Sequence, residues 1–175
     1  MTDGIGMIHL YTGDGKGKTT AALGLAFRAA GHGLRTLVVQ FMKCAEPYGE
    51  NRSASLFEGI TIMPMGRSCL IDADAPEKED IEAAGRAVEV ASEAMRSGEW
   101  DIVVLDEVNV AVKWNLVTEQ EVLDALRSKG DDVEVVLTGR YAPPSFHQIA
   151  DVITEMRKLR HPYDRGVLSR EGIDR

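Results

Sequence analysis

Short apolar segments alternate with longer segments of helical periodicity along most of this chain. The apolar segments, which we predict to be strands, are residues 7–11, 36–41, 59–63, 101–106, 133–138 and 152–156. The segments predicted to be helices are residues 18–30, 76–96, 118–127 and 146–150. Such alternation is typical of βαβ units, in which helices join parallel strands and cover the sheet. The pattern therefore predicts an α/β fold with a mostly parallel sheet and helices on both of its faces.

Glycine, proline and capping residues set the expected ends of the helices. Gly31 and Gly33 are expected to end the first helix, because glycine adopts the left-handed conformation found after a helix C-terminus. Pro76 is expected to lie early in the long helix, where its missing N–H costs no hydrogen bond. Thr118 and Glu121 have the spacing of a capping box at the start of the third helix.

Composition and charge narrow the class of protein. The chain has 175 residues, of which 44% are hydrophobic and 27% charged, as expected for one globular domain. Its net charge of -8 disfavours binding to duplex nucleic acid or to an anionic membrane surface. The two cysteines form no CxxC pair, no apolar run reaches the length of a membrane span, and residues 1–6 do not resemble an export signal. We therefore expect a cytoplasmic protein.

Residues 11–20, with the sequence Tyr-Thr-Gly-Asp-Gly-Lys-Gly-Lys-Thr-Thr, form the most specific motif of the chain. They follow a predicted strand and open a predicted helix, which is the context of a phosphate-binding loop. Glycines allow the backbone to wrap closely around an anion, and the helix N-terminus adds partial positive charge. Lys18 supplies a full charge, and Thr19 supplies a hydroxyl for a magnesium ion. The alternative is a glycine-rich turn with solvated lysines, which this context disfavours.

The loop departs from the common GxxxxGK[ST] pattern by one residue. Counting back from Gly17, the first glycine should stand at Thr12, but it stands at Gly13. The loop is therefore one residue tighter than usual, and Lys16 brings a second ammonium group into it. We infer that a triphosphate does not lie here as it does in ordinary ATPases.

Two carboxylates, Asp106 and Glu107, end the predicted strand 101–106. In an open parallel sheet ligands bind at the carboxyl ends of the strands, so both residues are expected to face the same crevice as the phosphate loop. A hard divalent cation such as Mg²⁺ relieves the repulsion between carboxylates and a polyphosphate. One carboxylate and Thr19 can bind that metal directly or through water. The alternative is a solvated strand end.

Further polar residues lie near the same predicted edge. Arg140 follows the strand 133–138 and can pair with phosphate oxygens or form a surface ion pair. Asn109 can orient a ligand or cap a turn, and Gln40 and Lys43 can line the crevice. The histidines, which show no metal-ligand spacing and are expected to be structural, are His9, His32, His147 and His161.

Taken alone, these residues indicate a magnesium-nucleotide site on a P-loop α/β domain. They do not identify a second substrate, and no general base is placed unambiguously. Transfer or hydrolysis of the γ-phosphate therefore stays open at this point, as does a regulator that binds a nucleotide without turnover.

Several segments together resemble the P-loop ATP:corrinoid adenosyltransferases, also called cob(I)alamin adenosyltransferases. The resembling segments are residues 11–22, 40–43 (QFMK), 104–109 (VLDEVN), 137–140 (LTGR), 150–156 (ADVITEM), 160–166 (RHPYDRG) and 172–174 (GID). The match runs through most of the chain, and the tight loop followed by LDE, TGR and HPY is far more specific than a phosphate loop alone. The resemblance implies a P-loop NTPase-like (RecA-like) single domain.

The resemblance implies that the cobalt of a reduced Co(I) corrinoid attacks the ribose C5′ of ATP. Triphosphate leaves intact, and an adenosylcorrinoid such as adenosylcobalamin forms. Co(I) carries no proton, so no general base is needed. The family also implies a homodimer and a separate flavin- or flavodoxin-type reductase that supplies Co(I). The physiological corrinoid, whether cobalamin, cobinamide or a cobyrinic acid derivative, is left open.

By family position, residues of the tight loop bind ATP and residues of the strand ends assist. Lys18, Glu107 and Arg140 are expected to act in the reaction, and Thr19 and Glu107 are expected to bind Mg²⁺ with Asp106 in support. The residues expected to bind the nucleotide are Thr12, Gly13, Asp14, Gly15, Lys16, Gly17, Lys18, Thr19 and Thr20.

The chain departs from better-known family members in two places. Those members carry aromatic residues in a Gly-Phe-Thr-Trp segment after a Met-Gly pair, whereas Met65 and Gly66 are followed here by Arg-Ser-Cys-Leu-Ile. Longer members have an N-terminal extension that covers the site, whereas only residues 1–6 precede the first predicted strand. We therefore expect that lid to be absent or replaced.

Overall fold

A parallel sheet forms the centre of the protein. In the computed structural model, which describes residues 6–44, 48–67 and 71–174, six strands lie in the order β3-β2-β4-β5-β1-β6, and every neighbouring pair is parallel. The strands are β1 (Ile8–Thr12), β2 (Thr36–Gln40), β3 (Ile60–Pro64), β4 (Ile102–Asp106), β5 (Glu134–Thr138) and β6 (Val152–Glu155). Each overlaps a segment predicted to be a strand, and β1 and β3 end one residue later than predicted, at Thr12 and Pro64.

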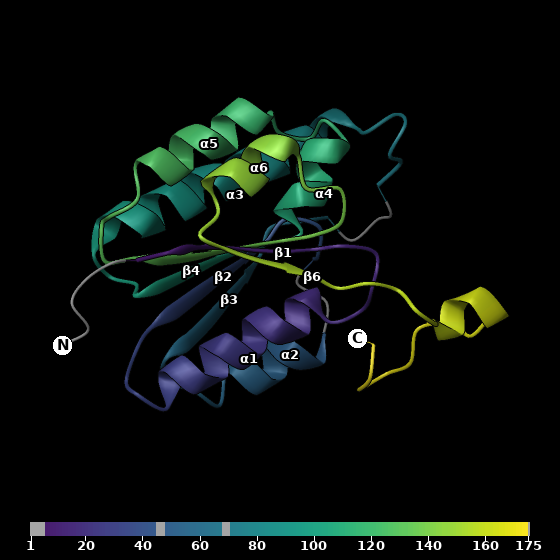
Figure 1. Cartoon of the computed structure of the whole chain (residues 1–175), viewed down its shortest axis with the longest axis horizontal. Helices are drawn as coiled ribbons and strands as arrows, with labels where there is room; N and C mark the ends of the chain where they lie inside the picture. Colours follow the sequence, from purple (N-terminus) through teal and green to yellow (C-terminus); the bar gives the residue numbers. More distant parts are fainter. Residues whose placement is uncertain (1–5, 45–47, 68–70, 175) are drawn as a thin grey trace.

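Helices cover both faces of this sheet (Figure 1). On one face lie α1 (Lys18–Ala30) and α2 (Gly49–Ala54). On the other face lie α3 (Lys78–Ser97), α4 (Val108–Lys113), α5 (Glu119–Arg127) and α6 (Pro144–Ile149). The chain then passes through the 3₁₀-helix η1 (Pro162–Arg165). The predicted α/β architecture is confirmed. No helix among the described residues is long and apolar enough to cross a bilayer.

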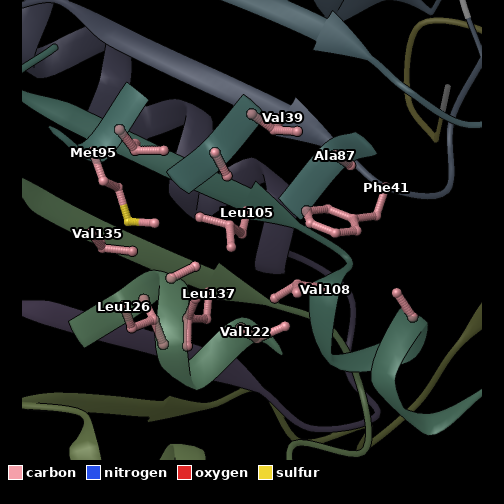
Figure 2. Close-up of a cluster of buried hydrophobic side chains, with 14 of the residues drawn as sticks. Val39, Phe41, Ala87, Met95, Leu105, Val108, Val122, Leu126, Val135 and Leu137 are labelled. Carbon is pink, nitrogen blue, oxygen red and sulfur yellow. The ribbon is translucent and has the colours of Figure 1, made fainter. Parts of the chain in front are cut away.

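The apolar character of the central strands follows from the two cores that they separate. Val103 and Leu105 of β4 belong to the core beneath α3 and α5, whereas Val104 belongs to the core beneath α1. Buried alanines on α3, including Ala87, allow that helix to lie close to the sheet (Figure 2). Because both faces of the strand are buried, nearly every position must be apolar.

Several helix ends differ in detail from the expectation; α6, for example, begins at Pro144 and ends at Ile149, whereas residues 146–150 were predicted. Gly31 keeps a right-handed conformation (φ −64°), and Gly33 (φ 76°) is the left-handed residue that ends α1. Helix α3 begins at Lys78 rather than at Pro76, so the predicted start of this helix was wrong. The reason is a capping box, in which the N–H of Glu77 donates to the Asp80 carboxylate.

Helix α5 begins as expected. The N–H of Thr118 donates to Glu121 Oε2 at 2.7 Å, which confirms the capping box at its start.

Of the residues that replace the family's aromatic segment, Arg67 contacts the carboxylates of Glu77 and Asp80. Residues 68–70 lie outside the described residues.

Candidate nucleotide site

A cavity of about 620 Å³ lies where the phosphate loop meets the carboxyl ends of β4 and β5. Its volume is in the range of small-molecule sites. Loop residues 14–19 line one side, and Glu107 and Arg140 line the strand ends. The position agrees with the rule that parallel α/β sheets bind ligands beyond the carboxyl ends of their strands.

The phosphate loop is held from behind by the segment that follows β6. The N–H of Gly15 donates to the carbonyl of Met156 at 2.6 Å. A side chain on Gly13 or Gly15 would come within 2.5 or 2.6 Å of that carbonyl oxygen, so the close approach requires glycine at both positions. Gly13 (φ 94°) and Gly17 (φ 120°) also have backbones that favour glycine. One loop N–H is therefore committed to the protein instead of facing the cavity.

The two lysines of the loop have different partners. Lys18 is buried, and its ammonium donates to the carbonyls of Gly13 at 2.8 Å and Gly15 at 2.7 Å. Burial lowers the pKa of Lys18, an effect that the nearby Glu107 carboxylate opposes. Lys16 is partly exposed and pairs with Asp174 Oδ1 at 2.8 Å. Both ammonium groups border the cavity but bind protein oxygens in this structure.

Asp106 is fully buried at the end of β4, and both of its carboxylate oxygens are bonded. Oδ1 accepts from the hydroxyls of Thr19 at 2.7 Å and Thr138 at 2.8 Å. Oδ2 accepts from Gln40 Nε2 at 3.3 Å and lies 3.4 Å from Lys43 Nζ. This network ties the start of α1 to the ends of three strands, β2, β4 and β5.

Glu107 follows in a left-handed conformation (φ 65°) and lines the cavity beside Thr19. Its N–H donates to the Thr138 hydroxyl at 2.9 Å, which fixes the turn. Burial, and then repulsion from Asp106, raises the pKa of the Glu107 carboxyl. A nearby cation would favour its ionised form.

The oxygen donors at this point fit Mg²⁺. Within the part of the chain that the structure describes, no group of three or more His, Cys, Asp or Glu side chains is arranged to hold a metal. A metal here would therefore need phosphate oxygens in addition to Thr19 and Glu107, as Mg²⁺ commonly has at nucleotide sites. The Thr19 hydroxyl donates its proton to Asp106, so its oxygen lone pairs stay available to a cation.

The loop after β5 brings Arg140 to the cavity. Asn109 Nδ2 donates to the carbonyl of Gly139 at 2.9 Å, and Gly139 has a φ of 131°. A side chain on Gly139 would lie 2.9 Å from the Cβ of Asn109, so the close packing requires glycine. Asn109 thus caps the turn, one of the two roles expected for it, and the exposed Arg140 borders the cavity.

Some cavity residues were not assigned from the sequence. Glu50 of α2 lines the cavity and accepts from Lys43 Nζ at 2.8 Å. His161 was expected to be structural; its Nδ1 accepts from the N–H of Tyr163, yet the residue also borders the cavity. Asp174 reaches the cavity through the returning tail. The local sequence around Glu50 carries no chemical motif, whereas the RHPYDRG segment around His161 and the terminal Gly-Ile-Asp were both part of the family resemblance.

Comparison with solved structures supports the fold alone. A KaiC-like protein from the hyperthermophilic archaeon Pyrococcus horikoshii OT3 superposes with a TM-score of 0.57 over 90% of this chain and 75% of that one, at 16% identity. This likeness supports the overall α/β fold and carries no functional assignment.

Comparison with known sequences supports a specific family. The profile of the ATP:corrinoid adenosyltransferase BtuR/CobO/CobP family matches residues 5–174. The corrinoid adenosyltransferase of Escherichia coli K12 is 36% identical over 97% of this chain and 85% of its own length. A corrinoid adenosyltransferase of Sinorhizobium is 34% identical over 99% of this chain and 82% of its own length. The tight loop, the acidic strand end and this near-complete match agree, and the chain belongs to the ATP:corrinoid adenosyltransferase family.

Proposed function

We propose that this protein transfers the 5′-deoxyadenosyl group of ATP to the cobalt of a reduced Co(I) corrinoid. The observation that carries the proposal is the family match over residues 5–174, which includes the shortened phosphate loop. The cobalt electron pair forms a bond to C5′, the bond from C5′ to the phosphate oxygen breaks, and its electrons leave with triphosphate. No proton is removed, so the site needs no general base.

The work of the protein is to position ATP and to stabilise charge on the departing triphosphate. The groups available for this are the ammonium groups of Lys16 and Lys18, the Arg140 guanidinium and the loop N–H groups other than that of Gly15, and their residues line the cavity. Asp106 is fully buried, and its oxygens accept hydrogen bonds from Thr19, Thr138 and Gln40, so its part is to hold the loop and the strand ends in place.

Mg²⁺, when bound, would neutralise part of the triphosphate charge. Thr19 and Glu107 would hold it, and Asp106 supports them by orienting the Thr19 hydroxyl. The pKa of Glu107, raised by burial and by Asp106, supports a cation at this position, since a cation restores the ionised carboxylate.

Several finer features belong to the same proposal. The protein acts in the cytoplasm as a homodimer, and a flavin- or flavodoxin-type reductase supplies the Co(I) state. Its corrinoid is cobalamin, cobinamide or a cobyrinic acid derivative. The family resemblance supports these features, and competition assays among the three corrinoids would rank them.

A turnover assay tests the proposal directly. The protein is incubated with ATP, Mg²⁺ and chemically reduced cobalamin or cobinamide, and the light-sensitive cobalt–carbon product is followed by absorbance. Phosphorus NMR of the same mixture is expected to show intact triphosphate. ADP or orthophosphate would instead indicate chemistry at the γ-phosphate, and ATP binding without turnover would indicate a regulator.

A further inference from the structure

The C-terminal tail returns to the phosphate loop. After β6 the chain runs outward through η1 and comes back toward the start of α1 (Figure 1). Gly172, Ile173 and Asp174 line the same cavity as the phosphate loop. A segment far from the loop in sequence therefore forms one wall of the candidate triphosphate site.

Asp174 is presented to the loop by a short hydrogen-bonded turn. Its Oδ1 lies 2.8 Å from Lys16 Nζ. Its Oδ2 accepts from the N–H of Arg170 at 3.0 Å and from Arg170 Nε at 2.9 Å, and its own N–H donates to the Arg170 carbonyl. The hydrogen bonds from Arg170 and Lys16 hold the pKa of the Asp174 carboxyl well below its usual range. The carboxylate is therefore ionised at neutral pH.

Little apolar burial holds the tail against the body of the protein. Tyr163, Leu168 and Ile173 are 71%, 77% and 62% exposed. Segments with few buried apolar contacts open at low free-energy cost. The ion pair between Lys16 and Asp174 is thus a principal contact between the tail end and the loop, and another anion can replace it readily.

We propose that Asp174 acts through Lys16: its carboxylate competes with the triphosphate group for the Lys16 ammonium. The proposal rests on the proposed function in so far as triphosphate is the group that binds and leaves. A carboxylate and a polyphosphate repel each other, so Lys16 cannot bind both closely without an electrostatic penalty. When triphosphate binds, it takes Lys16 and the tail moves outward. When the product dissociates, Asp174 recovers Lys16 and thereby lowers the affinity for the highly charged product.

Binding of inorganic tripolyphosphate, measured by titration calorimetry with Mg²⁺ present, tests this competition. Asp174→Asn is expected to bind tripolyphosphate about two- to fivefold more tightly than wild type, the range set by one partly exposed ion pair. Glu171→Gln, which removes the same charge from an exposed neighbour in the same tail, is the matched control and is expected to leave the affinity unchanged. The difference is expected to shrink at high salt.

A double-mutant cycle identifies Lys16 as the mediator. In a Lys16→Ala background the further change Asp174→Asn is expected to have a clearly smaller effect, because the shared partner is gone and only direct repulsion between the carboxylate and the polyphosphate is relieved. Unchanged or weaker binding by Asp174→Asn would overturn the proposal. So would equal tightening by Glu171→Gln, or an undiminished effect without Lys16.

Turnover gives a second readout that a purely structural role would not move. Asp174→Asn is expected to lower KM for ATP and to increase inhibition by added tripolyphosphate. The binding experiment requires no corrinoid. Absence of a cobalt–carbon product would therefore refute the proposed function alone, whereas unchanged tripolyphosphate binding would refute the role of Asp174 alone.

Discussion

Replacing Asp106 with alanine should destabilise the protein as well as impair nucleotide binding. The carboxylate has no exposed surface and accepts hydrogen bonds from Thr19, Thr138 and Gln40 while lying 3.4 Å from Lys43 Nζ. The variant removes the acceptor and leaves the donors around a small void. Because these donors come from α1, β2 and β5, the change weakens the junction between the loop and the sheet.

The expected cost follows from how many of these donors stay unsatisfied. The hydroxyls of Thr19 and Thr138 can rotate toward other acceptors. Lys43 Nζ keeps the Glu50 carboxylate as a partner at 2.8 Å, so the threonines and Lys43 each lose only part of their hydrogen bonding. Gln40 is fully buried and loses a carboxylate acceptor. Breaking a buried pair on one side costs about 3–5 kcal/mol, and a retained second partner reduces this. We therefore expect a loss of roughly 2–4 kcal/mol in the free energy of unfolding.

Urea denaturation at pH 7, followed by circular dichroism, measures this loss. Asp101→Ala is the control, since Asp101 stands exposed just before the same strand, and among the hydrogen bonds of the described residues its side chain accepts only the N–H of Arg35. Its removal should cost about 1 kcal/mol or less. An Asp106→Ala variant as stable as the Asp101→Ala control would show that the buried network does not hold the site together.

Three further predictions concern the loop and its acidic neighbour. Lys18→Ala should reduce the rate of adenosylation at least about 100-fold, the order expected for loss of one preorganised charge. Circular dichroism should show an intact fold, and substitution of the exposed Lys78, Lys78→Ala, is the control. Gly15→Ala should weaken ATP binding at least about tenfold, since its methyl group would lie 2.6 Å from the Met156 oxygen; an unchanged Kd by calorimetry would contradict this. Folding raises the pKa of Glu107, so the folded state binds the carboxyl proton more tightly than the unfolded chain does. The free energy of unfolding therefore falls as pH rises from the unfolded-state pKa of this group through its raised folded-state pKa. Glu107→Gln should therefore be more stable than wild type at pH 7 without Mg²⁺, yet less active, and a pH-independent difference in unfolding free energy would refute the assignment.

The fold and the centre of the site were predictable because their causes are local. The central strands are apolar at nearly every position, since Val103 and Val104 face different cores. The glycines of the loop and the carboxylates of Asp106 and Glu107 stand directly at strand ends, so topology alone places them at one edge. A prediction that depends on adjacent residues and on parallel topology needs no knowledge of long-range contacts.

The remaining features depend on contacts between distant parts of the chain. Helices α2 and α4 have six residues each, which is too short for a helical period to be recognised, and neither has a proline in its first turn to mark its start as the equally short α6 does. The contact of Gly15 with Met156 requires the position of β6 beside β1, and the pair of Lys16 with Asp174 requires the path of the tail. The start of α3 was misplaced because Asp80, rather than the proline, determines the first turn.

The partners of the phosphate loop suggest why a shortened loop suits this chemistry. The Gly15 N–H is bound to a backbone carbonyl within the fold, so it has little freedom to turn toward an anion. Lys18 and Lys16 bind oxygens through flexible side chains, and these contacts can be exchanged for phosphate oxygens. We therefore propose that this loop binds triphosphate through these movable ammonium groups together with its remaining N–H donors. A reaction in which the whole triphosphate departs requires charge stabilisation along its length and subsequent release, and exchangeable cations meet both requirements.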